Sequence, residues 1–93
     1  LFPDVPTATE AGIKDFVVIS FIGLYGPPGL SPEIVRRANG AMNTAMNDPA
    51  VAKGIVERGD APGGGTAEQL GTLTRTHYRM WGDVVKANNI QAD

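Results

Sequence analysis

A long, mainly apolar stretch of the chain runs from Phe16 to Tyr25 and reads FVVISFIGLY. It is rich in β-branched and aromatic residues and shows no alternation of apolar and polar positions, which is typical of a strand buried on both faces. We therefore predict a strand over residues 16–26. Gly23 inside this run predicts a bend, or a close approach of another segment to the backbone.

Three later segments carry apolar residues at the three-and-four spacing of an amphipathic helix. Two of them open with an N-capping residue followed by proline, at Ser31-Pro32 and at Asp48-Pro49. The third opens with Thr66 and a glutamine three residues later, which is the pattern of a capping box. The predicted helices cover residues 31–47, 49–58 and 67–88.

The same spacing predicts which helix faces are packed. In the first helix the polar face includes Asn39 and Asn43, and the apolar face comprises Ile34, Ala38, Ala41, Met42, Ala45 and Met46. In the third helix the apolar face comprises Leu70, Leu73, His77, Met80, Trp81, Val84 and Val85. We expect Trp81 to be buried, because large aromatic side chains on an apolar face dominate small cores.

Residues 1–15 are predicted to form a turn segment ahead of the strand. Thr7 and Glu10 form a second capping box, and Gly12 follows as a C-terminal cap. A single helical turn is therefore expected from Thr7 to Ala11.

Composition narrows the possible classes of function. The chain has 93 residues with 42% apolar and 19% charged residues, which is ordinary for one small globular segment. A net charge of −2 provides no broad positive field for nucleic acid. The absence of cysteine excludes disulfides and thiol nucleophiles. Because the chain begins at Leu1 and not at Met, we expect a processed or partial polypeptide.

No residue combination predicts catalysis, a cofactor or a metal site. His77 is the only histidine and has no second ligand-type residue at metal-binding spacing, so we interpret it as a packed or half-exposed side chain. Gly63-Gly64-Gly65 precedes a helix start and could form an anion-binding nest, but a flexible connector is the favoured interpretation. Ser31 and Thr66 are explained as helix caps.

One buried strand and three helices do not make a self-sufficient architecture. A strand that is apolar on both faces belongs inside a sheet covered by helices on either side, which gives the fold class α/β. The rest of the chain contains no second strand pattern. The neighbours of this strand are therefore expected to come from polypeptide outside these 93 residues.

Five ordered motifs resemble one known family. They are the turn DVPTATEAG, the run FIGLYGPPGLSP, the helix pair joined at DPAV, the loop GDAPGGGT, and a late Trp81 followed by VVKANNI. Together they cover nearly the whole chain. They resemble the C-terminal part of the tripartite tricarboxylate transporter substrate-binding proteins, the TctC or Bug family of receptors.

The resemblance implies a two-domain periplasmic-binding-protein fold of the type II kind, with residues 1–93 as a C-terminal portion. It implies an extracytoplasmic, periplasmic receptor that captures a small carboxylate-type metabolite, performs no catalysis, and delivers its ligand to a membrane permease. Ser20 and Phe21 are the substrate-binding candidates, because the strand is expected to pass near the domain junction. The main ligand-binding loops are expected in the N-terminal portion.

An alternative interpretation is a small stand-alone interaction module that docks on another protein through the apolar strand. An apolar segment with unpaired backbone edges also predicts that the isolated chain self-associates through residues 16–25.

Overall fold

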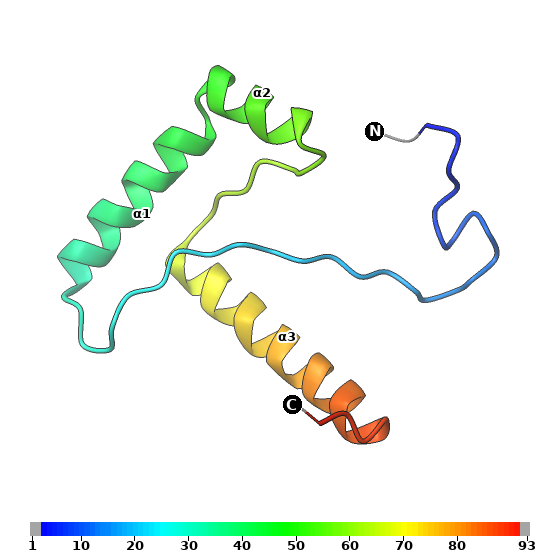
Figure 1. Ribbon diagram of the computed structural model, residues 1–93. Coiled ribbons are helices and arrows are strands. Elements are labelled where there is room, and N and C mark those ends of the chain that lie inside the picture. The colour runs from blue at the N-terminus through cyan, green and yellow to red at the C-terminus, as the bar shows by residue number, and fades with distance from the viewer. Residues whose placement is uncertain (1–2, 92–93) are drawn as a thin grey trace.

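The computed structural model describes residues 3–91, which contain three helices joined by turns and one long extended segment (Figure 1). The helices are α1 (Pro32–Met46), α2 (Pro49–Glu57) and α3 (Ala67–Ala87). Each bound lies within one residue of the range expected from the sequence. Leu1 and Phe2 of the expected turn segment lie outside the described residues.

The helices begin where the local capping chemistry places them. The Ser31 hydroxyl accepts a hydrogen bond from the Ile34 backbone at 3.3 Å, and the Asp48 carboxylate accepts two from the first turn of α2, at 2.8 and 3.2 Å. At α3 the Thr66 backbone N–H donates to Gln69 Oε1 at 2.8 Å, and the Gln69 backbone N–H donates to Thr66 Oγ1 at 3.1 Å. These bonds satisfy amide groups that a helix start otherwise leaves without partners.

The predicted turn near the N-terminus is confirmed. The Thr7 backbone N–H donates to Glu10 Oε2 at 2.8 Å, and the Glu10 backbone N–H donates to Thr7 Oγ1 at 3.3 Å. The turn closes with a hydrogen bond of 2.9 Å from the Ala11 N–H to the Thr7 carbonyl. Gly12 follows with a φ of +87°, a conformation that glycine adopts without the steric cost of a Cβ.

The strand predicted over residues 16–26 is wrong, and with it the α/β class for this chain. The segment is extended, but no residue among 3–91 forms a strand, and Figure 1 shows the segment running alone across α3. A strand requires a second backbone to accept and donate the ladder hydrogen bonds, and the rest of the described chain forms helices and turns. The high β propensity of residues 16–26 does not form a strand without a second backbone to pair with.

The described residues form an open structure without a buried core. No residue among 3–91 is buried, and Ile22 is fully exposed. The chain exposes 8349 Å², whereas a compact monomer of this mass would expose about 5,200 Å². The radius of gyration is 17.1 Å, against about 12 Å for a compact domain of this length. The expected burial of Trp81 is also wrong, because that side chain is 42% exposed.

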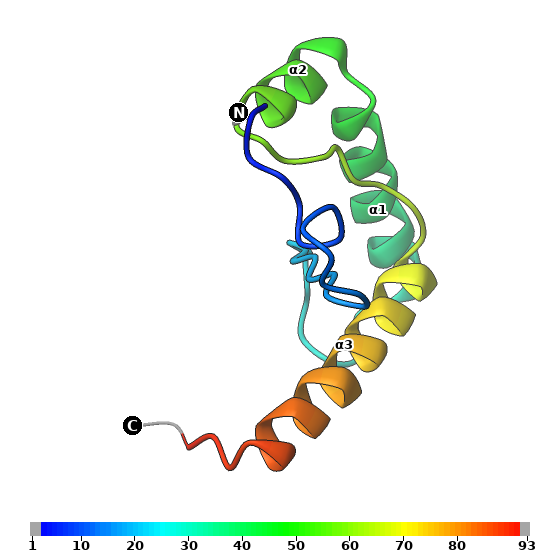
Figure 2. The ribbon, with the colours of Figure 1, turned by 90° about the vertical axis from the view of Figure 1, so that its right-hand side faces the viewer.

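The three helices follow an arc in the turned view, with α2 and α3 at its two ends and α1 between them (Figure 2). The principal extents are 46, 35 and 25 Å, which describes an elongated body. α1 and α2 contact each other directly. The extended segment lies against α3 through its Phe21 and Tyr25 side chains.

Candidate functional site

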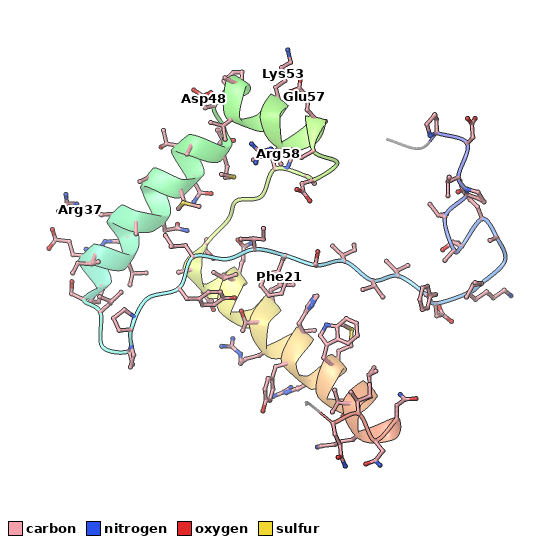
Figure 3. All side chains as sticks on the ribbon, viewed as in Figure 1. Phe21, Arg37, Asp48, Lys53, Glu57 and Arg58 are labelled. Carbon is pink, nitrogen blue, oxygen red and sulfur yellow. The ribbon has the colours of Figure 1, made fainter. Side chains whose placement is uncertain are left out.

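Alternate residues of the extended segment contact α3. The Phe21 ring, labelled in Figure 3, meets the His77 ring edge to face, with the centroids 4.9 Å apart and the planes at 83°. Both side chains are half-buried. Aromatic pairs favour this geometry because the positive edge of one ring meets the negative face of the other. The expectation for His77 was a packed or half-exposed side chain, and it has this environment.

At Gly23 the backbone of the segment comes close to a side chain of α3. A Cβ at this position would lie 2.9 Å from Leu70 Cδ1 and 2.9 Å from Tyr25 Cε2. The close approach expected from a glycine within the apolar run is therefore confirmed. Ile22 and Leu24, which alternate with these residues, are 101% and 62% exposed. One side of the segment therefore contacts α3, and the other side is apolar and exposed to solvent.

A shallow hollow lies between the segment and the middle of α3. Its volume is about 240 Å³, and its lining consists of Val18, Ile19, Ser20, Phe21, His77 and Trp81. The two substrate-binding candidates, Ser20 and Phe21, therefore lie together at one hollow. Its volume is smaller than the roughly 300 to 1,000 Å³ of ordinary ligand pockets, so the described residues supply one wall of a site at most.

The chemistry of this wall is mostly apolar. The polar side-chain groups of the lining residues are the Ser20 hydroxyl, the His77 imidazole and the Trp81 indole N–H, and no lysine or arginine contributes to the lining. Aromatic and aliphatic side chains here can contact the carbon skeleton of a small metabolite. The hydrogen-bond donors that these residues carry for a ligand carboxylate are the Ser20 hydroxyl, the His77 imidazole N–H and the Trp81 indole N–H.

The loop before α3 is held by α1, which the sequence did not predict. Asn43 Nδ2 donates to the Gly65 carbonyl at 2.8 Å, and the Gly65 N–H donates to Asn43 Oδ1 at 2.8 Å. Asn39 Nδ2 donates to the same carbonyl at 2.9 Å. Both asparagines were expected on the solvent face of α1, but both are half-buried, whereas Ile34 on the expected packed face is 51% exposed.

The same bonds bear on the two interpretations of the Gly63-Gly64-Gly65 loop. An anion-binding nest needs free backbone N–H groups, but the Gly65 N–H is bonded to Asn43 and the Thr66 N–H to Gln69. A flexible connector needs a loop without tertiary bonds. The loop instead ends at a glycine that α1 holds in place.

The described part of the chain offers neither a metal site nor a membrane span. No group of three or more His, Cys, Asp and Glu side chains among residues 3–91 could hold a metal ion. No helix in that range is long and apolar enough to cross a membrane.

Comparison with known proteins gives consistent matches to one family. The family described as the tripartite tricarboxylate transporter family receptor, TctC, matches residues 1–90. The "UPF0065 protein in clcB-clcD intergenic region" of Pseudomonas knackmussii is 36% identical over 80 residues, covering 86% of this chain and 47% of that protein. The "UPF0065 protein in tcbD-tcbE intergenic region" of Pseudomonas sp. strain P51 is 29% identical over 92 residues, covering 98% of this chain and 27% of that protein.

Protein BugT of Bordetella pertussis is 29% identical over 85 residues, covering 91% of this chain and 26% of BugT. The chain thus spans about half the length of the first relative and about a quarter of the other two. No solved structure matches it. Neither the structure nor these relatives support the expected self-association through residues 16–25. The resemblance to a receptor family is confirmed, and the chain belongs to the tripartite tricarboxylate transporter receptor family, TctC.

Proposed function

We propose that these residues are part of a periplasmic solute-binding receptor that captures a small carboxylate-type metabolite and delivers it to the membrane permease of a tripartite transporter. The observation that carries this proposal is the family match over residues 1–90. Receptors of this kind bind and release their ligand, so no reaction is assigned to the chain. Residues 1–93 would form the C-terminal portion of the receptor.

The open structure supports a role as one portion of a larger protein. The chain exposes roughly 3,000 Å² more surface than a compact domain of its mass. Much of the exposed apolar surface belongs to one segment, whose exposed large side chains are Phe16, Val17, Val18, Ile19, Ile22, Leu24 and Tyr25. Relatives such as BugT have about three quarters of their length outside the matched region, which is enough polypeptide to cover this surface.

Within this receptor, Ser20 and Phe21 are proposed to form part of the ligand site. Both line the hollow on α3, where Phe21 is held against His77. The opposite wall and the cationic groups that hold a carboxylate would come from the remaining polypeptide. Phe21 would contact the carbon skeleton, and the Ser20 hydroxyl would donate to a polar ligand atom.

A thermal-shift screen of the receptor that carries these residues tests the proposal. Dicarboxylates, tricarboxylates, amino acids and aromatic acids are added singly, and the melting temperature is measured. A ligand present at 100 times its Kd stabilises the folded state by about 2.7 kcal/mol. The matched controls are the corresponding acid amides, which keep the carbon skeleton but lack the charge.

Variants then test the site residues. Ser20→Ala and Phe21→Ala should weaken binding of the acid found in the screen, while Tyr78→Ala, at an 81% exposed position of α3, should leave it unchanged. If no organic acid shifts the melting temperature, the receptor function is contradicted. If an acid binds and both site variants bind it normally, only the site assignment fails.

The alternative, a stand-alone interaction module, depends on the same exposed apolar side. The match to a receptor family along nearly the whole chain favours the receptor. A start codon closely upstream of the Leu1 codon would favour the module instead, whereas an export signal and a long α/β sequence encoded there would favour the receptor.

A further inference from the structure

We propose that Asn43 is a positioning residue that fixes α3, and with it the candidate ligand wall, relative to α1 by pairing with the backbone of Gly65. This role concerns the geometry of the chain and does not depend on the identity of any ligand. Three features support it: the hydrogen bonds between one side-chain amide and one residue of the loop, the conformation of that loop, and its direct connection to the first turn of α3.

The pairing has two points of contact. The Asn43 amide donates to the Gly65 carbonyl and accepts from the Gly65 N–H, both at 2.8 Å. A single side chain thus satisfies both backbone polar groups of one residue, in the manner of a neighbouring strand. Two simultaneous bonds restrict the orientation of the loop more than one bond does.

Asn39 reinforces this arrangement from one turn earlier on α1. Asn39 Nδ2 donates to the Gly65 carbonyl at 2.9 Å, and Asn43 Nδ2 also lies 3.0 Å from the Asn39 carbonyl and 3.2 Å from Asn39 Oδ1. Asparagine is a weak helix former because its side chain competes for backbone groups. Two asparagines in the interior of α1 are explained by their bonds to a backbone group outside the helix.

The loop conformation requires glycine at the point of contact. Gly64 and Gly65 have φ values of +146° and +116°, a region that side-chain-bearing residues rarely adopt. A Cβ at Gly65 would lie 2.5 Å from Gln69 Oε1, the group that caps α3, and a Cβ at Gly64 would lie 3.0 Å from Asn43 Oδ1. Close approach of α1 and the start of α3 therefore depends on these two glycines.

Gly65 is joined directly to α3, the helix that carries one side of the candidate site. The next residue, Thr66, is the N-cap of α3, and α3 carries Thr74 and His77, which hold the extended segment. Among the described residues, the hydrogen bonds that connect α1 to the loop before α3 are those of Asn39 and Asn43 with Gly65, and none connects α1 to α3 itself. Of the three hydrogen bonds that join α1 to Gly65, Asn43 makes two, so its side chain is the main polar link between α1 and the start of α3.

The test uses Asn43→Asp in the receptor that carries these residues. Above its pKa the aspartate has no proton to donate to the Gly65 carbonyl, and its charge is repelled by that oxygen. When protonated, the carboxylic acid has one donor and one acceptor in the places of the asparagine amide. The pairing should therefore be lost at pH 7 and restored as the pH falls below about 4, the ordinary range of an aspartate.

Spin labels at Arg37 on α1 and at Tyr78 on α3, both exposed, report the distance between the helices. We expect one narrow distance distribution for the unsubstituted protein at both pH values. For Asn43→Asp we expect a broad distribution at pH 7 that narrows to the unsubstituted one at low pH. Hydrogen exchange in the 60–66 loop should be about tenfold faster at pH 7 in the variant, since one hydrogen bond is lost.

Asn47→Asp is the matched control, because Asn47 Nδ2 donates at 2.8 Å to the Asn43 carbonyl within α1 and does not bond the loop. Its distance distribution should match the unsubstituted protein at both pH values. Asn43→Leu, which cannot pair at any pH, should stay broad at both. A narrow distribution for Asn43→Leu, or an Asn43→Asp distribution that does not change with pH, would overturn the proposal.

Discussion

The Tyr25 hydroxyl lies 2.7 Å from Thr74 Oγ1, 49 residues later in the chain. Thr74 Oγ1 itself lies 2.8 Å from the Leu70 carbonyl of its own helix. A threonine hydroxyl has one proton, and the carbonyl can only accept, so Thr74 donates to Leu70 and Tyr25 donates to Thr74. This is the hydrogen bond that joins the extended segment to α3.

Tyr25→Phe removes this bond and keeps the ring. We expect the substitution to lower the free energy of unfolding of the receptor by about 1 kcal/mol or less, because Tyr25 is 57% exposed and water replaces part of the lost bond. Chemical denaturation measures the change. Tyr78→Phe is the control, since Tyr78 is 81% exposed, and it should have no measurable effect. Equal effects for the two variants would contradict the role of the bond.

Gly23→Ala should weaken the contact between the segment and α3. The added Cβ would meet Leu70 Cδ1 and Tyr25 Cε2 at 2.9 Å, so at least one of these side chains has to move. Overpacking of this kind costs about 1 to 3 kcal/mol. We expect a lower melting temperature for the receptor and faster hydrogen exchange in residues 16–25.

Gly40→Ala is the matched control and should have the opposite sign. Gly40 lies within α1, and a Cβ there would meet nothing within 4 Å. Alanine is favoured over glycine in a helix by about 0.8 to 1.0 kcal/mol. A loss of stability from Gly40→Ala in the receptor would mean that other polypeptide packs on this side of α1.

The Glu10 carboxyl should titrate below its ordinary pKa of 4.5. The backbone N–H of Thr7 is the main cause of the lowered pKa, and the Thr7 hydroxyl contributes further, since both donate to the ionised form. Because the Glu10 pKa is lower in the folded state, the ionised carboxylate stabilises the turn at pH values above the ordinary pKa of the group. This stabilisation is lost as the pH falls through the lowered pKa of the folded state.

Carbon-detected NMR of the Glu10 carboxyl measures this pKa directly, and the Thr7 amide shift should titrate with it. Thr7→Val removes the hydroxyl but keeps the backbone N–H, so it should raise the Glu10 pKa part of the way towards 4.5. A Glu10 pKa at or above 4.5 in the unsubstituted protein would contradict the turn.

The sequence predicted the helices well because their boundaries depend on neighbouring residues. Ser31, Asp48 and Thr66 accept hydrogen bonds from amides two or three positions later, and those positions can be read directly. The strand over residues 16–26 failed for the opposite reason. Its β-branched and aromatic residues favour a sheet, but a sheet requires a second strand to pair with, and the described residues contain none.

The candidate site was predictable only in part. Ser20 and Phe21 were named from the expected course of the strand, while the contacts of Phe21 with His77 and of Tyr25 with Thr74 join residues about 50 positions apart and follow no local pattern. Asn43 was assigned to solvent because it is polar. The available signal was its position inside a helix, where asparagine is unfavourable unless it has a partner.

The isolated 93-residue chain should unfold over a broad temperature range and bind no small carboxylate. It has no buried residue between positions 3 and 91, and it removes from water only about two fifths of its unfolded surface, against about 60 to 65% for a compact domain of this size. Since the heat capacity of unfolding follows the area exposed, we expect about two thirds of the 1.1 to 1.4 kcal/mol/K typical of this length. Scanning calorimetry measures the width of the unfolding transition and the heat capacity of unfolding. Titration calorimetry with citrate and glutamate tests binding. A sharp transition with the full heat capacity, or a micromolar complex with either acid, would show that these residues close a core and a site by themselves.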